Sequence, residues 1–257
     1  MERPAASLAG TVAWVTGSAR GMGAAHALLL AERGADIVLQ DVLKDEAAET
    51  AAAIAKLGRR VHVALADVSD VGAVKRVAAE AIAALGRIDI LVNNAGIGQH
   101  KPVDEITEAD YDRMMDIHVK GAFFCTQAVL PGMKERRWGK IVNISSIWGM
   151  TGAGINTASH YCGAKAALLG LTKAWAKELA PWNIHVNAVA PGGVLTEMPI
   201  KIQGWDKIRE KEKRVPLGRW ARPEEVSYAV AFLASHEADF ITGQVLSPSG
   251  GETIVGI

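Results

Sequence analysis

The chain has little of several features that mark special classes of protein. Of its 257 residues only Cys125 and Cys162 are cysteines, and they lie far apart without a CxxC pair. This argues against a disulfide framework and against a zinc site, so we expect no metal. No apolar run reaches the roughly 18 residues that span a bilayer, and the first ten residues do not look like a secretion signal. We therefore expect a cytoplasmic protein.

An excess of charge of either sign is also missing. The 28 Lys and Arg residues balance 28 Asp and Glu residues, which gives no basic surplus for binding nucleic acid or an anionic membrane. Hydrophobic residues make up 49% of the chain and charged residues 22%, as in ordinary folded proteins. The sequence contains no internal repeat or linker. We expect one domain over residues 1–257 that acts on a small molecule.

Short apolar segments alternate with helix-length segments along the chain. We expect strands at Val12–Thr16, Asp36–Asp41, Val61–Ala66, Ile88–Val92, Lys140–Ser145, Ile184–Val189 and Gln244–Ser247. We expect helices at Met22–Arg33, Lys44–Leu57, Asp70–Leu85, Glu108–Arg136, Ser159–Ala180 and Pro223–Ser235. This alternation predicts an α/β fold, a doubly wound (Rossmann-like) parallel sheet with helices on both faces. The polar segment 195–220 breaks the rhythm, and we expect a mobile substrate lid there.

A glycine-rich segment joins the first strand to the first helix. It contains Gly17, Ser18, Arg20, Gly21, Met22 and Gly23. Glycines at such a turn let the backbone approach a pyrophosphate, which rests on the helix N-terminus. The spacing is GxxxGxG rather than GxGxxG, so the turn alone is weak evidence, and a plain strand–helix turn is the alternative. Its place after the first strand favours a dinucleotide site.

Two charged residues near this turn point to different cofactors. Asp41 ends the second strand, 24 residues after Gly17. A carboxylate there accepts hydrogen bonds from the adenosine ribose and repels a 2′-phosphate, which favours NAD over NADP. Arg20 is a possible partner for a 2′-phosphate and points the other way. We give Asp41 more weight, because a carboxylate at the ribose directly repels a 2′-phosphate. We therefore predict NAD as the cofactor.

A tyrosine and a lysine form the second chemical signal. Tyr161 and Lys165 are four residues apart on one predicted helix and so share a face. A nearby ammonium favours the phenolate and lowers the pKa of a tyrosine, which then exchanges a proton with a substrate hydroxyl. Ser146 follows the fifth strand, at the edge where doubly wound folds bind ligands. An ordinary surface pair is the alternative for Tyr161 and Lys165 taken alone.

These motifs together resemble the short-chain dehydrogenase/reductase family. The match runs from about Val12 to Gly251 and comprises, in family order, Thr16–Gly23, Asn93-Asn94-Ala95-Gly96, Ser146, Tyr161 with Lys165, and Pro191-Gly192. Each motif alone is modest, but five in order are highly specific. The resemblance implies an NAD(P)-linked oxidoreductase, and a homotetramer or homodimer built on the helices at 108–136 and 159–180.

The resemblance also implies roles for single residues. Tyr161 would be the acid/base, Ser146 would orient the substrate oxygen, and Lys165 would lower the tyrosine pKa and bind the nicotinamide ribose. The remaining cofactor contacts implied are Asp67 and Val68 at the adenine, Asn94 along the adenosine ribose, and Val194 and Thr196 at the carboxamide.

The chain departs from the family pattern at two places. His118 stands where the family usually has an asparagine that anchors a water molecule. A histidine holds a water too and titrates near neutral pH, so we predict a proton-relay role for His118; a packed helix histidine is the alternative. Ser146 and Tyr161 are 15 residues apart rather than about 13, which suggests a small insertion beside the substrate.

The substrate is the least determined part of this interpretation. The pocket candidates by position are His100, Trp148, Met150, Asn156, Thr157, His160 and the lid. Their polar side chains favour a polyol, sugar or hydroxy acid. Residues 201–214 carry six basic and three acidic side chains, which attracts an anionic group, although a solvated helix shows the same pattern.

Three functions fit these observations. The first is an NAD-dependent dehydrogenase or reductase of small polar secondary alcohols and ketones. The second is an NADP-linked reductase, for instance of 3-oxoacyl thioesters, which Arg20 allows and Asp41 opposes. The third is a dinucleotide-binding regulatory protein without catalysis, to which only the departure at His118 points.

Overall fold

The computed structural model describes residues 7–152 and 158–255, and its centre is a parallel sheet. Seven strands follow the order β3-β2-β1-β4-β5-β6-β7, and every neighbouring pair is parallel. The strands are β1 (Val12–Thr16), β2 (Asp36–Asp41), β3 (Val61–Leu65), β4 (Ile90–Asn93), β5 (Gly139–Ile144), β6 (Ile184–Val189) and β7 (Val245–Leu246). The doubly wound α/β fold expected from the alternation is confirmed.

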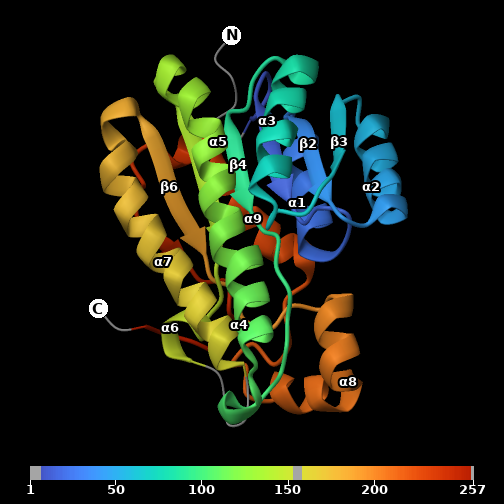
Figure 1. The fold of residues 1–257 in the computed structure, drawn as a ribbon. Coiled ribbons are helices and arrows are strands. Elements are labelled where there is room, and N and C mark those ends of the chain that lie inside the picture. The colour runs from blue at the N-terminus through green and yellow to red at the C-terminus, as the bar shows by residue number, and fades with distance from the viewer. Residues whose placement is uncertain (1–6, 153–157, 256–257) are drawn as a thin grey trace.

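Helices cover both faces of this sheet, as Figure 1 shows. One face carries α1 (Gly21–Glu32), α2 (Lys44–Lys56) and α9 (Pro223–Ala234). The other carries α3 (Val71–Leu85), α5 (Gly121–Arg136) and α7 (Ser159–Leu179). The remaining helices are α4 (Glu108–Met115), α6 (Trp148–Thr151) and α8 (Glu197–Glu212), with short 3-10 turns at Val103–Glu105, Ala180–Trp182 and His236–Ala238.

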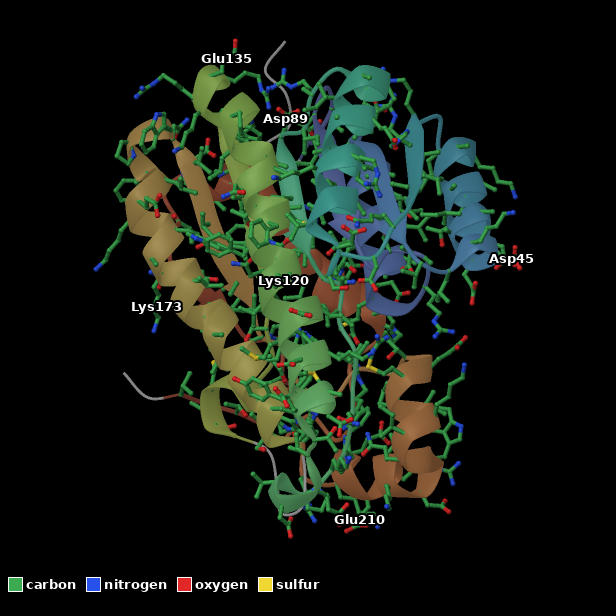
Figure 2. The ribbon with its side chains drawn as sticks, in the orientation of Figure 1. Asp45, Asp89, Lys120, Glu135, Lys173 and Glu210 are labelled. Carbon is green, nitrogen blue, oxygen red and sulfur yellow. The ribbon has the colours of Figure 1, made fainter. Side chains whose placement is uncertain are left out.

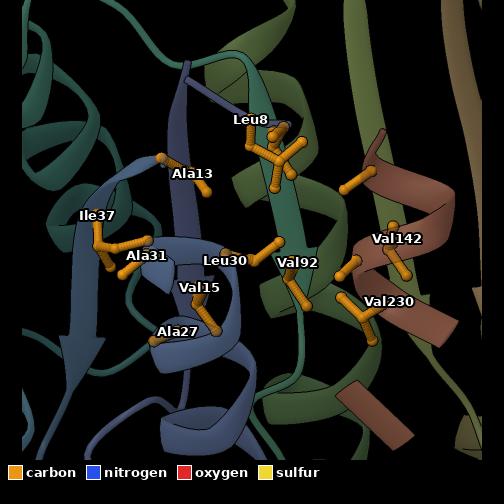
Figure 3. Close-up of a cluster of buried hydrophobic side chains, with 14 of the residues drawn as sticks. Leu8, Ala13, Val15, Ala27, Leu30, Ala31, Ile37, Val92, Val142 and Val230 are labelled. Atoms are coloured by element: carbon orange, nitrogen blue, oxygen red, sulfur yellow. The ribbon is translucent and has the colours of Figure 1, made fainter. Parts of the chain in front are cut away.

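The two helical layers meet the sheet in two apolar cores. Side chains alternate across a strand, so Ala13 and Val15 of β1 enter one core and Trp14 enters the other. Figure 3 shows the first core, where Leu30 of α1 and Val230 of α9 pack against the strands. The strands β1, β4, β5 and β6 are buried along their whole length, and their sequences are mainly apolar rather than alternating.

Three predicted segments differ from the structure. The helix expected over 108–136 is α4 and α5 joined by a π-helical turn, Asp116–Lys120, which contains His118. The segment 195–220 contains a true helix, α8, which is kinked at Gly204, where φ is +75°. Its polar sequence hid the helix, because most of its side chains face solvent. The last strand is also shorter than expected, Val245–Leu246 only.

The order of the strands fixes where a ligand binds. The chain winds outward in one direction from β1 to β3 and in the other from β4 to β7. At such a reversal the connections after β1 and β4 diverge and leave a crevice at the carboxyl ends of the strands. The glycine-rich turn follows β1, Asn94 follows β4 and Ser146 follows β5, so all three lie at this edge. None of the helices in the described residues has the length and apolar character needed to cross a membrane.

Candidate active site

The glycine-rich turn is shaped by backbone angles that favour glycine. Gly17 and Gly21 have φ of +62° and +60°, a region that residues with a Cβ seldom adopt. At Gly23 a Cβ would overlap the carbonyl oxygen of Gly17, so only glycine lets α1 start this close to β1. The side chain of Arg20, at the N-cap position of α1, forms no capping hydrogen bond. The first N–H groups of α1 therefore face the crevice without a cap from this residue, an arrangement that suits a pyrophosphate.

Neighbouring polar side chains hold this turn in place. The Asn94 side chain donates to the carbonyls of Thr16 and Gly17, both at 2.9 Å. The Ser18 hydroxyl is buried and donates to the Val15 carbonyl at 2.9 Å. The Ser18 hydroxyl is therefore occupied, and only the main chain of Ser18 is open to a ligand. The Asn94 side chain holds the carbonyl groups at the start of the turn.

Asp41 lies directly beside the turn, as the sequence predicted. Its carboxylate accepts from the main-chain N–H of Ala19 at 2.8 Å, and of Val42 at 2.7 Å and Leu43 at 3.1 Å. A carboxylate has about four acceptor positions, and these three bonds fix its orientation at the end of β2. The negative charge is thus held rigidly next to the start of α1.

Arg20 is engaged by two carboxylates. Its guanidinium lies 3.0 Å from the Glu197 carboxylate and 3.8 Å from that of Glu46. Glu197 is the first residue of α8, so this ion pair connects the glycine-rich turn to the segment expected to be the lid. A Cβ at Gly21 would lie 3.6 Å from Thr196, which places Thr196 against the turn. Val194, two residues earlier, is buried and bridged to Ala221.

The residues expected at the adenine lie at the carboxyl end of β3. The Asp67 carboxylate accepts from the main-chain N–H and the hydroxyl of Ser69, at 2.9 and 2.8 Å. Val68 is buried, and a Cβ at Gly121 would collide with it. The Val68 side chain is thus packed against the protein, whereas only Oδ1 of Asp67 is used by Ser69, so the Asp67 carboxylate keeps acceptor capacity for a base.

Tyr161, Ser146 and Lys165 come together at the carboxyl ends of β5 and β6. Burial of the phenol raises the pKa of Tyr161 to about 12, and the Ser146 side chain, which interacts with the phenol, opposes part of this rise. Lys165 Nζ lies 5.6 Å from the centre of the tyrosine ring. The sequence-based argument that the lysine sets the phenol pKa is corrected here, because burial dominates it in the protein itself.

Lys165 is one of the few buried charged groups of the chain. Its Nζ donates to the Ile144 carbonyl at 2.7 Å, and its own carbonyl accepts from the Ser145 hydroxyl at 2.8 Å. Burial lowers the pKa of Lys165 to about 7. The two bonds tie α7 to the end of β5, and thereby fix the distance between Ser146 and Tyr161.

A buried chain of amides supports the same junction from below. Asn93 of β4 donates to Asn143 of β5 at 2.8 Å, and Asn143 donates to the Thr172 hydroxyl of α7 at 2.8 Å. Each of these polar groups would cost free energy if it were buried without a partner. The chain therefore fixes α7 relative to β4 and β5, one layer below the reactive groups.

His118 lies beside Tyr161 but does not titrate as expected. The two rings meet edge to face at 5.4 Å. Burial, reinforced by the charge of Lys165, lowers the pKa of His118 well below its usual value, so the expectation that it titrates near neutral pH is wrong. Its Nε2 bonds the main chain of Ile97 at 2.9–3.0 Å, and its Nδ1 has no partner among the described residues.

The rings of Trp148 and His100 form an aromatic wall beside Tyr161. The Trp148 ring lies 6.0 Å from the Tyr161 ring and 5.8 Å from the His100 ring. His160 is buried and bonds Gln99 at 2.7 Å. Met150 is half-buried on α6 with Trp148. Two further pocket candidates, Asn156 and Thr157, lie outside the described residues.

The sequence analysis missed several residues of this region. Gln99 also donates to Asp110 at 2.7 Å, and Lys101 pairs with the same carboxylate at 2.7 Å. Asp110 and Thr107 form a capping box at the start of α4, and its T-x-x-D spacing is visible in the sequence. No local sequence pattern could predict the contact of Glu197 with Arg20, because 177 residues separate them.

Comparison with known proteins supplies the family. A family model described as Enoyl-(Acyl carrier protein) reductase matches residues 17–253. The 3-oxoacyl-[acyl-carrier-protein] reductase FabG of Thermotoga maritima is 41% identical over 248 residues, which cover 96% of this chain and 99% of that protein. This chain belongs to the short-chain dehydrogenase/reductase family. It is therefore an oxidoreductase by family, as the motifs had indicated.

Solved structures of members of this family also match nearly the whole of this chain. A short-chain alcohol dehydrogenase structure from Sinorhizobium meliloti superposes with a TM-score of 0.92 at 38% identity, over 97% of this chain and 98% of the other. A gluconate 5-dehydrogenase from Burkholderia cenocepacia contains NADP (TM-score 0.90, 36% identity, 96% and 97% covered). Carveol dehydrogenase from Mycobacterium avium contains NAD (0.90, 34%, 95% and 98%). Relatives thus use either cofactor.

The buried Lys165 predicts a pH dependence of stability. Between the folded pKa of about 7 and the unfolded pKa of 10.5, unfolding takes up a proton, so the lysine's contribution to stability rises with pH in this window and is constant below it. We expect the urea midpoint of wild type, relative to that of Lys165→Met, to rise from pH 7 to pH 9.5. A constant difference between the two midpoints would show that Lys165 keeps its ordinary pKa.

Proposed function

We propose that this chain transfers a hydride between NAD(H) and a small polar secondary alcohol or its ketone, with Tyr161 as the acid/base. The substrate class is a polyol, a sugar or a hydroxy acid. The single observation that carries the proposal is the junction of β5 and α7, where the Ser146 side chain interacts with the Tyr161 phenol and the buried Lys165 ammonium lies 5.6 Å from the centre of the tyrosine ring. A nicotinamide supplies the hydride acceptor or donor when it is bound.

Tyr161, Ser146 and Lys165 have different roles in the proton transfer. With a pKa of about 12, Tyr161 is a neutral phenol at pH 7, the form that donates a proton to a ketone oxygen. Ser146 holds that oxygen beside the phenol. Lys165, with a pKa of about 7, exchanges a proton near neutral pH and restores the tyrosine. Alcohol oxidation needs the reverse transfer, and we expect it to accelerate as the pH rises.

We propose that His118 takes part in proton transfer without changing its own charge. It is a neutral imidazole, so it does not carry charge through the pH range of interest. Its Nδ1 is a buried hydrogen-bonding atom without a partner among the described residues, on a ring that packs against Tyr161. We propose that it holds a water molecule that passes protons to Lys165, as the family asparagine does by resemblance.

Two groups of contacts support NAD as the cofactor. The Asp41 carboxylate is fixed by three main-chain N–H groups at the end of β2. Arg20, which is the possible partner for a 2′-phosphate, is already paired with Glu46 and Glu197. A phosphate entering here would meet three carboxylates, and their repulsion disfavours NADP. Gly17, Gly21, Met22 and Gly23 of the turn would hold the pyrophosphate at the start of α1.

An NADP-linked reductase of 3-oxoacyl thioesters is the second candidate. The observation in its favour is the 41% identity to FabG over 248 residues. We rank it second because the charges around Arg20 oppose a 2′-phosphate. A non-catalytic regulatory role ranks last, because the groups for proton transfer are all in place.

We also propose that the segment 195–220 is a lid and that the chain forms a homotetramer or homodimer. The lid would open by breaking the exposed ion pair of Arg20 with Glu197. The contact between copies would involve α5 and α7, where Phe123 is 40% exposed and packs against the Trp175 ring.

Removing the Tyr161 hydroxyl tests the reaction itself. We expect Tyr161→Phe to lower kcat with the best substrate about 10²–10⁴-fold, the usual contribution of a general acid/base, while NADH binding measured by fluorescence stays the same. Tyr111→Phe, at an exposed tyrosine, is the control and should keep full activity. A regulatory protein would show no turnover in wild type and unchanged NADH binding in both variants.

Neutralising Asp41 tests the cofactor. We expect Asp41→Asn to lower the ratio of kcat/KM with NAD to kcat/KM with NADP at least about tenfold, which corresponds to about 1.4 kcal/mol of lost repulsion. Asp45→Asn, an exposed carboxylate at the start of α2, is the matched control. A wild type that works only with NADPH and a 3-oxoacyl thioester would replace this proposal by the second candidate.

Light scattering tests the assembly. We expect a molar mass two or four times the 27.2 kDa of one chain, and a lower mass for Phe123→Asp, because the substitution places a charge in the proposed apolar contact. A wild-type mass near 27.2 kDa at working concentration contradicts the oligomer.

A further inference from the structure

The helix α8 closes the crevice at the carboxyl end of the sheet. Figure 2 shows Glu210 on this helix at the end of the molecule opposite Asp89, which precedes β4. A Cβ at Gly98 would lie 3.0 Å from Ile202 and 3.2 Å from Met198, so the first half of α8 packs on the loop after β4. Residues near the end of α8 thereby come over the aromatic wall of the active site.

The basic side chains of 201–214 are not equivalent in the structure. Lys201 is paired with Glu197 at 3.0 Å, and Arg214 with Glu210 at 3.5 Å; all four are exposed. Lys211 is half-buried, and its Nζ donates to the neutral amide oxygen of Gln203. Most of this run therefore behaves as a solvated helix, and Lys211 does not.

Lys211 points toward the active site rather than to solvent. Its Nζ lies 5.6 Å from the centre of the Trp148 ring, and the Tyr161 ring lies 6.0 Å from the same indole. Its charge also reaches His100, where burial first and then Lys211 and Lys207 lower the pKa. The ammonium of Lys211 and the ring of Tyr161 are thus both neighbours of one indole ring.

The charge of Lys211 is not fully compensated by the protein. Among the described residues no carboxylate lies within ion-pair distance of its Nζ; Glu252 and Glu210 act on it from farther away. Burial is the largest influence and lowers the pKa of Lys211. A partly desolvated ammonium of this kind is costly by itself, and an anionic ligand offsets the cost.

We propose that Lys211 binds a carboxylate of the substrate, so that the enzyme acts on hydroxy acids or oxo acids whose carboxylate lies several carbon atoms from the reacting carbon. Lys211 already contacts the side-chain amide of Gln203, and the nitrogen of that amide is a second hydrogen-bond donor. Two donors suit the two oxygens of a carboxylate. Trp148 spans the distance between the two polar ends and packs against the carbon chain. The inference rests on the proposed function, because it places the reacting carbon at Tyr161.

Matched acids and amides test this inference. The probes are 4-oxopentanoate, 5-oxohexanoate and 4-oxocyclohexanecarboxylate, each with its carboxamide, reduced with NADH at pH 7. We expect the best acid to have a kcat/KM at least about tenfold above that of its amide, the effect of one charge-assisted hydrogen bond. The length of the best acid reports the distance from Tyr161 to Lys211.

Variants assign the preference to one side chain. Lys211→Met should bring the ratio of acid to amide close to one by lowering kcat/KM of the acid alone. Lys211→Arg should restore most of the ratio, which a purely structural role for the lysine would not require. Lys213→Gln, an exposed residue two positions away, is the control and should leave the ratio unchanged.

The outcomes separate this inference from the proposed function. Turnover of amides and acids with equal kcat/KM, or a preference for acids that survives in Lys211→Met, overturns the carboxylate site and leaves the dehydrogenase intact. Turnover of a neutral 3-oxoacyl thioester in preference to every acid has the same meaning. Silence with the oxo acids alone overturns the inference. Silence that extends to a panel of polyols, sugars and hydroxy acids with NAD and NADP overturns the proposed function as well.

Discussion

The pairing of β1 with β4 is the constraint on which the rest of the molecule depends. These two strands are neighbours in the sheet although two strands and three helices separate them in the chain. Their parallel pairing brings the ends of β1, β4 and β5 to one edge, so the turn at Gly17, the Asn94 side chain and Ser146 meet there. Every contact described in the active site presupposes this one arrangement of strands.

Burial sets the chemistry at that edge more than charge does. The same desolvation raises the pKa of Tyr161 and lowers the pKa values of Lys165 and His118. Tyr161 and His118 are thereby uncharged near neutral pH, while Lys165 is brought close to the midpoint of its titration. A site with so little permanent charge is compatible with a buried position, and no ion pair among these three groups has to be broken.

The sequence predicted the parts of the site whose signal is local. Tyr161 and Lys165 share a helix face, and the glycines of the first turn follow a strand, so spacing together with the family resemblance pointed to them. Asp41 was found in the same way. The cost of burial was not visible, which is why the pKa arguments for Tyr161 and His118 needed correction. The contacts of α8 were also hidden, because Lys211 and Trp148 are far apart in the chain and meet only in the folded protein.

The π-helical turn at Asp116–Lys120 has a consequence for how this chain tolerates length changes. A single residue removed from a helix rotates everything beyond it by about 100° and shortens it by about 1.5 Å. The segment is held at one end by the capping box of Thr107 and Asp110, and at the other by Met133, which packs so tightly on Gly139 that no Cβ fits there. His118 lies between these two anchors. A deletion between these anchors would therefore turn the His118 ring away from Tyr161.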